Sequence, residues 1–111
     1  MLTKYTIGRN LEYKVIKHLK SVGYETIRSA GSHGLCDIIA GRQSNEVLVI
    51  QVKRSNYLSR TEMDSLIEFA HMFNGIPVFV FQKSKRKSLE WYRICPEKEL
   101  IKLSKSLYLK Q

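Results

Sequence analysis

Two neighbouring stretches decide how this chain folds: Arg28-Ser-Ala-Gly-Ser-His-Gly-Leu-Cys-Asp37-Ile-Ile-Ala-Gly41 and Val47-Leu-Val-Ile-Gln51-Val-Lys53. An acidic residue opens the apolar run of the first stretch, and a Gln-x-Lys pair closes the apolar run of the second. Each run predicts a buried strand, and a polar group beside a buried strand needs a partner. Because side chains alternate along a strand, Gln51 and Lys53 are expected on one face, roughly 7 Å apart.

Helices are predicted on either side of these strands. Leu11, Val15 and Leu19 recur at helical spacing, which predicts a helix over residues 7–22. Ser59 and Glu62 have the spacing of a capping box and predict a second helix over residues 61–73. The other predicted elements are strands at 24–30, 35–40, 47–53, 76–82 and 89–94, and a short C-terminal helix from residue 96. The order α-β-β-β-α-β-β-α describes an α/β fold, in which a central mixed sheet of about five strands is flanked by helices.

Composition restricts the kind of partner. The length of 111 residues predicts a single domain, residues 1–111, and the formal net charge of +9 favours a polyanion, with nucleic acid ahead of a membrane. No apolar run approaches the roughly 20 residues that a membrane span needs, and the N-terminus has no signal-peptide pattern. We therefore expect a cytoplasmic protein (host cytoplasm if it is viral) with neither a membrane partner nor a small-molecule substrate. Cys36 and Cys95 lie in apolar segments without C-x-x-C spacing, which predicts reduced thiols.

The polar residues of the strands and of the first helix suit phosphodiester hydrolysis. A divalent cation can stabilise charge on the phosphate and supply a nucleophile at neutral pH, and hard cations prefer oxygen ligands. The candidate ligands are the side chains of Glu12, Asp37 and Gln51 and the backbone carbonyl of Val52, with Lys53 beside the phosphate. The alternative interpretation is an exposed helical Glu12 paired with Arg9, together with a structural aspartate and a lysine extending into solvent from a strand end.

Several segments in order resemble the archaeal-type Holliday junction resolvases. They are Arg28-Ser-Ala-Gly-Ser32, Asp37-Ile-Ile-Ala-Gly, Gln51-Val-Lys53, Leu66-Ile-Glu-Phe-Ala and Phe73-Asn-Gly-Ile-Pro-Val78, so the resemblance covers nearly the whole chain through Val80. These enzymes belong to the PD-(D/E)xK nuclease superfamily, which implies a restriction-endonuclease-like fold. The resemblance also implies a homodimer that binds four-way DNA junctions and makes symmetric, Mg²⁺-dependent nicks.

The resemblance assigns roles by position. Glu12, Asp37 and Gln51 become metal ligands, Lys53 becomes the catalytic lysine, and Arg28 and Ser32 match the motif around the site, where phosphate contact is expected. One position departs from the family, which usually has Glu where this chain has Gln51. An amide oxygen can coordinate a metal but brings no charge, so we expect weaker metal binding, with Mn²⁺ able to substitute for Mg²⁺. Two alternatives stay open: another repair or restriction-type nuclease of the same superfamily, and a catalytically inactive junction-binding protein.

Basic residues outside this centre are candidates for DNA binding. His33 is a candidate for phosphate contact or a general base, although a solvated turn histidine is the favoured interpretation. Contacts to the phosphate backbone predict recognition of junction shape over base sequence and a steep fall of affinity with salt. Apolar residues such as Met72, Phe73 and Phe79 are candidates for a subunit interface. The DNA-binding candidates are Arg9, Arg28, Ser32, His33, Arg54, Arg60, Lys83, Lys85, Arg86 and Lys87.

Overall fold

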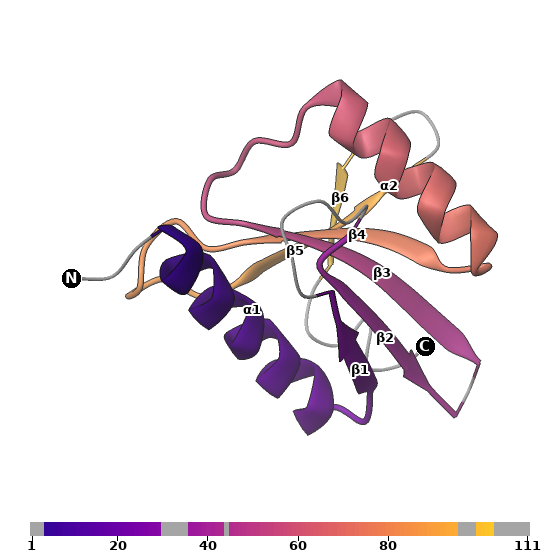
Figure 1. The fold of residues 1–111 in the computed structure, drawn as a ribbon, viewed down its shortest axis with the longest axis horizontal. Helices are drawn as coiled ribbons and strands as arrows, with labels where there is room; N and C mark the ends of the chain where they lie inside the picture. Colours follow the sequence, from indigo (N-terminus) through magenta and orange to yellow (C-terminus); the bar gives the residue numbers. More distant parts are fainter. Residues whose placement is uncertain (1–3, 30–35, 44, 96–99, 104–111) are drawn as a thin grey trace.

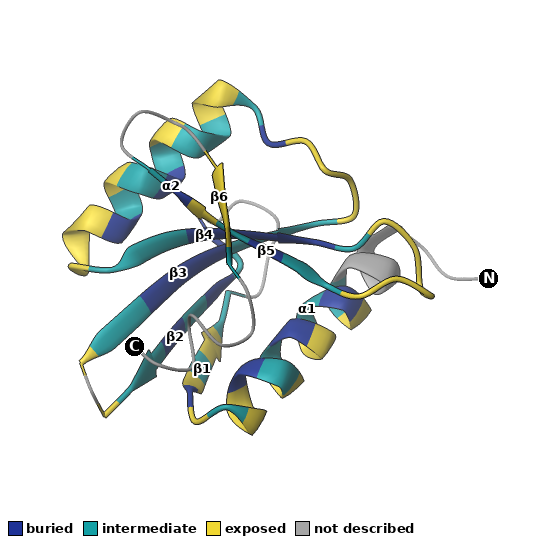
Figure 2. Ribbon diagram, turned by 180° about the vertical axis from the view of Figure 1, so that it is seen from behind, coloured by how far each residue is buried: buried dark blue, intermediate teal, exposed yellow. Residues whose placement is uncertain are grey.

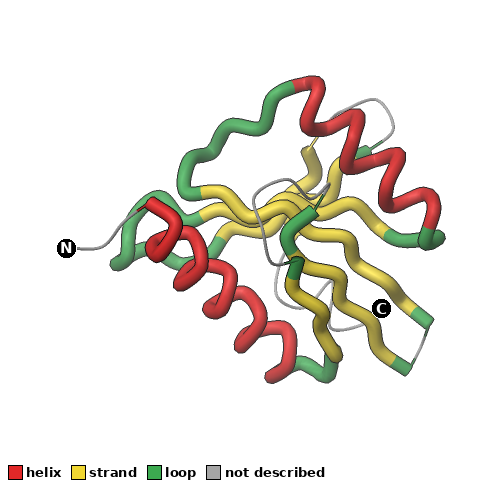
Figure 3. Tube along the Cα trace, viewed as in Figure 1, coloured by secondary structure: helices red, strands yellow, loops and turns green. Residues whose placement is uncertain are grey.

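The described part of the chain forms two helices and six strands. The computed structural model describes residues 4–29, 36–43, 45–95 and 100–103, with side chains described from residue 9 onward. Figures 1 and 3 show the elements along the chain. Their bounds are α1 Lys4–Ser21, β1 Glu25–Arg28, β2 Ile38–Arg42, β3 Glu46–Lys53, α2 Arg60–Met72, β4 Ile76–Phe81, β5 Glu90–Ile94 and β6 Leu100–Leu103.

The six strands form one mixed sheet in the order β1-β2-β3-β4-β5-β6. All neighbouring pairs are antiparallel except β3 and β4, which run parallel and are joined by α2. A parallel pair needs such a crossover, since a tight turn can join only antiparallel strands. The prediction of a mixed α/β sheet flanked by helices is therefore confirmed.

Each helix covers one face of the sheet (Figure 1). Val15 and Leu19 of α1 pack with Ile50 of β3 and Val78 of β4 in one buried cluster. Leu66 and Ala70 of α2 pack in a second cluster, together with the alternate strand residues Val49, Phe79 and Phe81. Since β3 and β4 bury both faces, their side chains are apolar almost throughout, and Figure 2 shows the buried residues concentrated there. Phe79 is fully buried in this core, so its proposed place in a subunit interface is wrong.

The helix ends follow the local sequence. Gly23 adopts a positive φ of 98° directly after α1, a conformation that favours glycine. At the start of α2, the Ser59 side chain accepts from the Glu62 backbone N–H, and the Glu62 side chain accepts from the Ser59 backbone N–H. This confirms the predicted capping box. After α2, Asn74 has a positive φ of 51°, and the Gly75 N–H donates to the Ala70 carbonyl at 2.8 Å.

The C-terminal helix is the main error of the sequence prediction. Residues 100–103 form strand β6, which pairs antiparallel with β5 in the register Trp91↔Leu103 to Ile94↔Leu100. This pairing gives hydrogen bonds to the backbone donors and acceptors at the edge of β5. A four-residue segment gains less as a single helical turn, because starting a helix is costly. The rest of the predicted helix lies outside the described residues, and so does the start of the strand predicted at 35–40.

Cys36 and Cys95 are both free thiols, as predicted. Within the described part of the chain, no helix is long and apolar enough to cross a membrane.

Candidate active site

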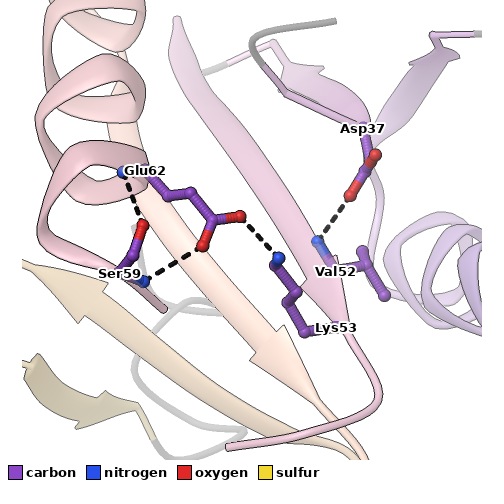
Figure 4. A network of polar contacts seen from close by, with 5 residues as sticks. All are labelled: Asp37, Val52, Lys53, Ser59 and Glu62. Carbon is purple, nitrogen blue, oxygen red and sulfur yellow. Dashed lines mark hydrogen bonds and ion pairs between the residues drawn. The ribbon is translucent and has the colours of Figure 1, made fainter. Parts of the chain in front are cut away.

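Asp37 stands at the head of β2 and is anchored to β3. Its backbone N–H donates to the Ile50 carbonyl at 2.8 Å, and its Oδ2 accepts from the Val52 N–H at 2.8 Å (Figure 4). The last regular pair of the two strands is Ile38 with Ile50, and Asp37 continues the contact through these two hydrogen bonds to β3. The Asp37 carboxylate is therefore fixed against the backbone of β3, next to the segment that carries Gln51 and Lys53.

Glu12 reaches the same region from α1. Its Oε1 accepts from Arg28 Nε at 2.8 Å, and both side chains are only 17% exposed. The guanidinium of Arg28 also lies 5.2 Å from the centroid of the Tyr13 ring. Arg28 therefore ties β1 to α1 and holds the Glu12 carboxylate in place. The alternative of an exposed helical glutamate at position 12 is wrong.

Burial and three charged side chains from other elements determine the electrostatics of Asp37. Burial raises the pKa of Asp37 from 3.8 to about 6. The Val52 hydrogen bond lowers that pKa, the nearby Glu12 carboxylate raises it, and the Lys53 and Arg28 cations lower it. Glu12, Arg28 and Lys53 are thus all close enough to act on Asp37, although they come from three segments. A buried acid next to a second acid favours a bound cation, which would relieve both the desolvation and the repulsion.

Lys53 makes an ion pair that the sequence analysis missed. Its Nζ lies 2.5 Å from Oε2 of Glu62, whose other oxygen, Oε1, accepts from the Ser59 N–H at 3.0 Å (Figure 4). Burial raises the pKa of Glu62, but the hydrogen bonds from Lys53 and Ser59 outweigh burial, so the net pKa lies below its usual value. The only sequence signal was an acidic residue at the capping position of the helix that follows the Gln-x-Lys strand.

The donor set can accommodate a hard divalent cation. Among the described residues there is no group of three or more His, Cys, Asp or Glu side chains arranged to hold a metal. The Glu12 and Asp37 carboxylates act on each other electrostatically, whereas Gln51 and the Val52 carbonyl stay predicted ligands. Mg²⁺ is commonly held by one or two carboxylates and keeps several waters. The two acids therefore suit the chemistry of such an ion.

The predicted DNA-binding residues are spread around this centre. Arg54 and Lys85 line one cavity, of about 280 Å³, which also includes Asn10 and Lys14 of α1. The sequence analysis missed Lys14, whose Nζ lies 3.4 Å from Oε1 of Gln82. Ser32 and His33 lie outside the described residues. Arg9 is half-buried on α1, whereas the exposed members of the set are Arg54, Arg60, Lys83, Lys85, Arg86 and Lys87.

A helix-flanked mixed sheet with an acid-x₁₃-Gln-x-Lys centre defines the class of the protein as a PD-(D/E)xK-type nuclease fold. The family model described as archaeal Holliday junction resolvase (Hjc) matches residues 3–109. The chain belongs to this family.

Two relatives show how far the similarity extends. The chain is 38% identical over 81 residues to the crossover junction endodeoxyribonuclease Hjc of Methanocaldococcus jannaschii. That match covers 69% of this chain but only 59% of the relative. Among solved structures, Archaeoglobus fulgidus Hjc, a Holliday junction resolvase from an archaeal hyperthermophile, superposes with a TM-score of 0.67 at 27% identity. The superposition covers 91% of this chain and 86% of that structure.

Proposed function

We propose that this protein is a structure-selective endodeoxyribonuclease that cleaves four-way DNA junctions by metal-dependent phosphodiester hydrolysis. The observation that carries the proposal is that Glu12 of α1 and Lys53 of β3 both act electrostatically on the buried Asp37 carboxyl at the head of β2. Membership of the Hjc family supports the same substrate. A protein that only bound DNA would gain nothing from burying two carboxylates where phosphate must approach. Its DNA substrate favours the cytoplasm, of the cell itself or of a viral host.

The side chains divide the chemistry between them. Glu12, Asp37, Gln51 and the Val52 carbonyl would hold Mg²⁺, with Mn²⁺ as a substitute. When bound, such an ion neutralises phosphate charge and lowers the pKa of a water molecule. The Lys53 ammonium stabilises the negative charge that develops on the phosphate, and Arg28 keeps Glu12 oriented through their salt bridge. Ser32 remains a candidate phosphate contact.

The junction is bound mainly through its phosphates. The net charge of +9 and the cavity formed by Lys14, Arg54 and Lys85 favour backbone contacts, which position DNA without reading its sequence. The exposed turn from Lys83 to Lys87 extends the basic surface beside this cavity. Selectivity would therefore come from the shape of the junction.

Two copies of the chain would match the two equivalent strands that are cut. An apolar surface suited to pairing lies at the C-terminal end of α2, which is exposed in Figure 2. Met72 is 75% exposed and Phe73 is 45% exposed, and the Phe73 ring packs edge-on against Phe69 at 5.1 Å between centroids. Large exposed apolar groups side by side commonly mark interfaces, and a two-fold pair would present two active sites symmetrically.

The decisive assay offers a four-way junction, a linear duplex and a flap, each with Mg²⁺, with Mn²⁺ and with EDTA. Paired symmetric nicks in the junction alone support the proposal. Equal cutting of all three substrates indicates another nuclease of the superfamily, and tight binding without cutting indicates an inactive junction binder. Asp37→Ala is the control, because it should abolish cleavage while junction binding persists.

A further inference from the structure

The Lys53–Glu62 ion pair connects the catalytic strand to a helix that has no other assigned part in the chemistry. Lys53 is the last residue of β3, and Glu62 lies in the first turn of α2, after the connection formed by residues 54–59. The two charged groups are 2.5 Å apart. Their side chains point toward each other across the space between strand and helix (Figure 4).

The Glu62 carboxylate is held at both of its oxygens. Oε1 accepts from the Ser59 backbone N–H at 3.0 Å, while Oε2 meets the Lys53 ammonium. The Glu62 backbone N–H is held in turn by Ser59 Oγ at 3.1 Å. A lysine side chain is long and loses several rotamers when it is fixed, so an anchored carboxylate is an effective way to keep its ammonium at one place.

The neutral side chain at position 51 makes this anchor more important. Gln51 and Lys53 share a face of β3, because they are two residues apart on one strand. A glutamate at position 51 would place a negative charge on that face near the Lys53 ammonium. Here position 51 carries an amide, and the carboxylate that neutralises Lys53 comes from Glu62 on α2.

We infer that Glu62 is a positioning residue: it fixes the Lys53 ammonium for the scissile phosphate and provides the negative charge that Gln51 lacks. The inference rests on the catalytic role proposed above for Lys53. It makes the capped N-terminus of α2 part of the active centre, because the group that starts the helix also orients the lysine.

Glu62→Gln separates this role from the role of Glu62 in folding. Glutamine also satisfies the capping box, so the variant keeps the helix start and loses only the ion pair. Glu25→Gln, on the exposed surface of β1, makes the same change in residue type and net charge away from the site and serves as the matched control. Both variants and the parent protein are compared on a four-way junction with the enzyme in excess.

The inference predicts that Glu62→Gln lowers the single-turnover rate of cleavage by about 10- to 100-fold, as expected for a group that orients an active-site residue. Junction affinity in EDTA and the Mg²⁺ concentration for half-maximal rate should stay within twofold of the parent protein, and Glu25→Gln should match the parent throughout. An unchanged rate overturns the inference. A weakened Mg²⁺ dependence also overturns it, because Glu62 would then be a metal ligand, and weakened junction binding would make it a DNA-binding residue.

Two further variants keep the test decisive. If Glu62→Gln does not fold, Glu62→Asp provides the same test. It keeps the negative charge but moves it away from Lys53 by the length of one methylene group. This variant too should lower the cleavage rate while junction affinity stays unchanged. Lys53→Ala tests the proposed function itself. Full cleavage by Lys53→Ala refutes the proposed centre, whereas loss of cleavage in Lys53→Ala with normal cleavage in Glu62→Gln refutes only the positioning role.

Discussion

Replacing Asp37 with asparagine should stabilise the metal-free protein at pH 8. The Asp37 carboxyl is buried beside the Glu12 carboxylate, and its pKa is raised from 3.8 to about 6. Keeping it ionised in the folded state therefore costs free energy that the unfolded chain does not carry. Asparagine has nearly the same shape and can still accept the Val52 hydrogen bond through its amide oxygen, but it has no charge to bury.

The size and sign of the effect follow from linkage. The folded state binds the Asp37 proton more tightly than the unfolded state, so this group costs most above pH 6, where it is ionised in both states. At about 1.4 kcal/mol per pH unit of pKa difference, that cost is about 3 kcal/mol at pH 8. It falls to about 1.5 kcal/mol at pH 5 and to about 0.5 kcal/mol at pH 4, as the folded carboxyl becomes protonated. The cost of burying the Asp37 charge thus decreases as the pH falls from 6 to 4, and the free energy of unfolding increases by the same amount through this group.

Urea unfolding in EDTA at pH 8 and pH 5 measures the difference in the free energy of unfolding between Asp37→Asn and the parent protein. Any constant difference between amide and acid cancels when the two pH values are compared, and so do other titrating groups common to both chains. The advantage of the variant should shrink by about 1.5 kcal/mol on going from pH 8 to pH 5. A gap that is independent of pH, or that widens in acid, would refute the reasoning, because the buried charge would then not be the source of the cost.

Four other changes test the remaining features. Gln51→Glu should lower the Mg²⁺ concentration for half-maximal cleavage by about an order of magnitude, since it adds charge to the ligand set; an unchanged metal titration would show that position 51 is not a ligand. Ser59→Ala should reduce the free energy of unfolding in urea by about 1 kcal/mol through loss of the helix cap, and an unchanged midpoint would contradict the capping geometry. Lys85→Ala should flatten the log–log dependence of junction affinity on salt by about one ion, measured by fluorescence anisotropy, whereas a parallel curve would exclude a phosphate contact. Phe73→Glu should shift the mass measured by light scattering from dimer to monomer, and a persistent dimer would place the interface elsewhere.

The parts of the fold that depend on local sequence could be predicted. The alternation of Gln51 and Lys53, the capping box at Ser59 and the helix end at Gly23 are decided by residues within a few positions of one another. The approach of Asp37 to the Gln-x-Lys strand was also predictable, because both segments are apolar strands joined by a short polar turn. Local rules therefore found the parts of the candidate site contributed by β2 and β3.

The errors and omissions concern contacts between distant segments. The choice of Arg28 as the partner of Glu12 requires β1 to lie beside α1, and the pairing of Lys53 with Glu62 depends on the path of the crossover from β3 to α2. Residues 100–103 became a strand because β5 offered an unpaired edge, a feature that exists only after the sheet has formed. No pattern within these segments encodes such partners.

The strand order has a consequence for how the protein behaves in solution. Among the strands that the structure describes, β1 and β6 are the outermost. Each presents a ribbon of backbone donors and acceptors with an apolar side chain in solvent: Ile27 is 71% exposed on β1 and Ile101 is 50% exposed on β6. Such ribbons can recruit strands from other molecules, and mutual repulsion between chains of charge +9 opposes that recruitment. Concentrated stocks should therefore remain clear at low ionic strength and become turbid as added salt screens the repulsion.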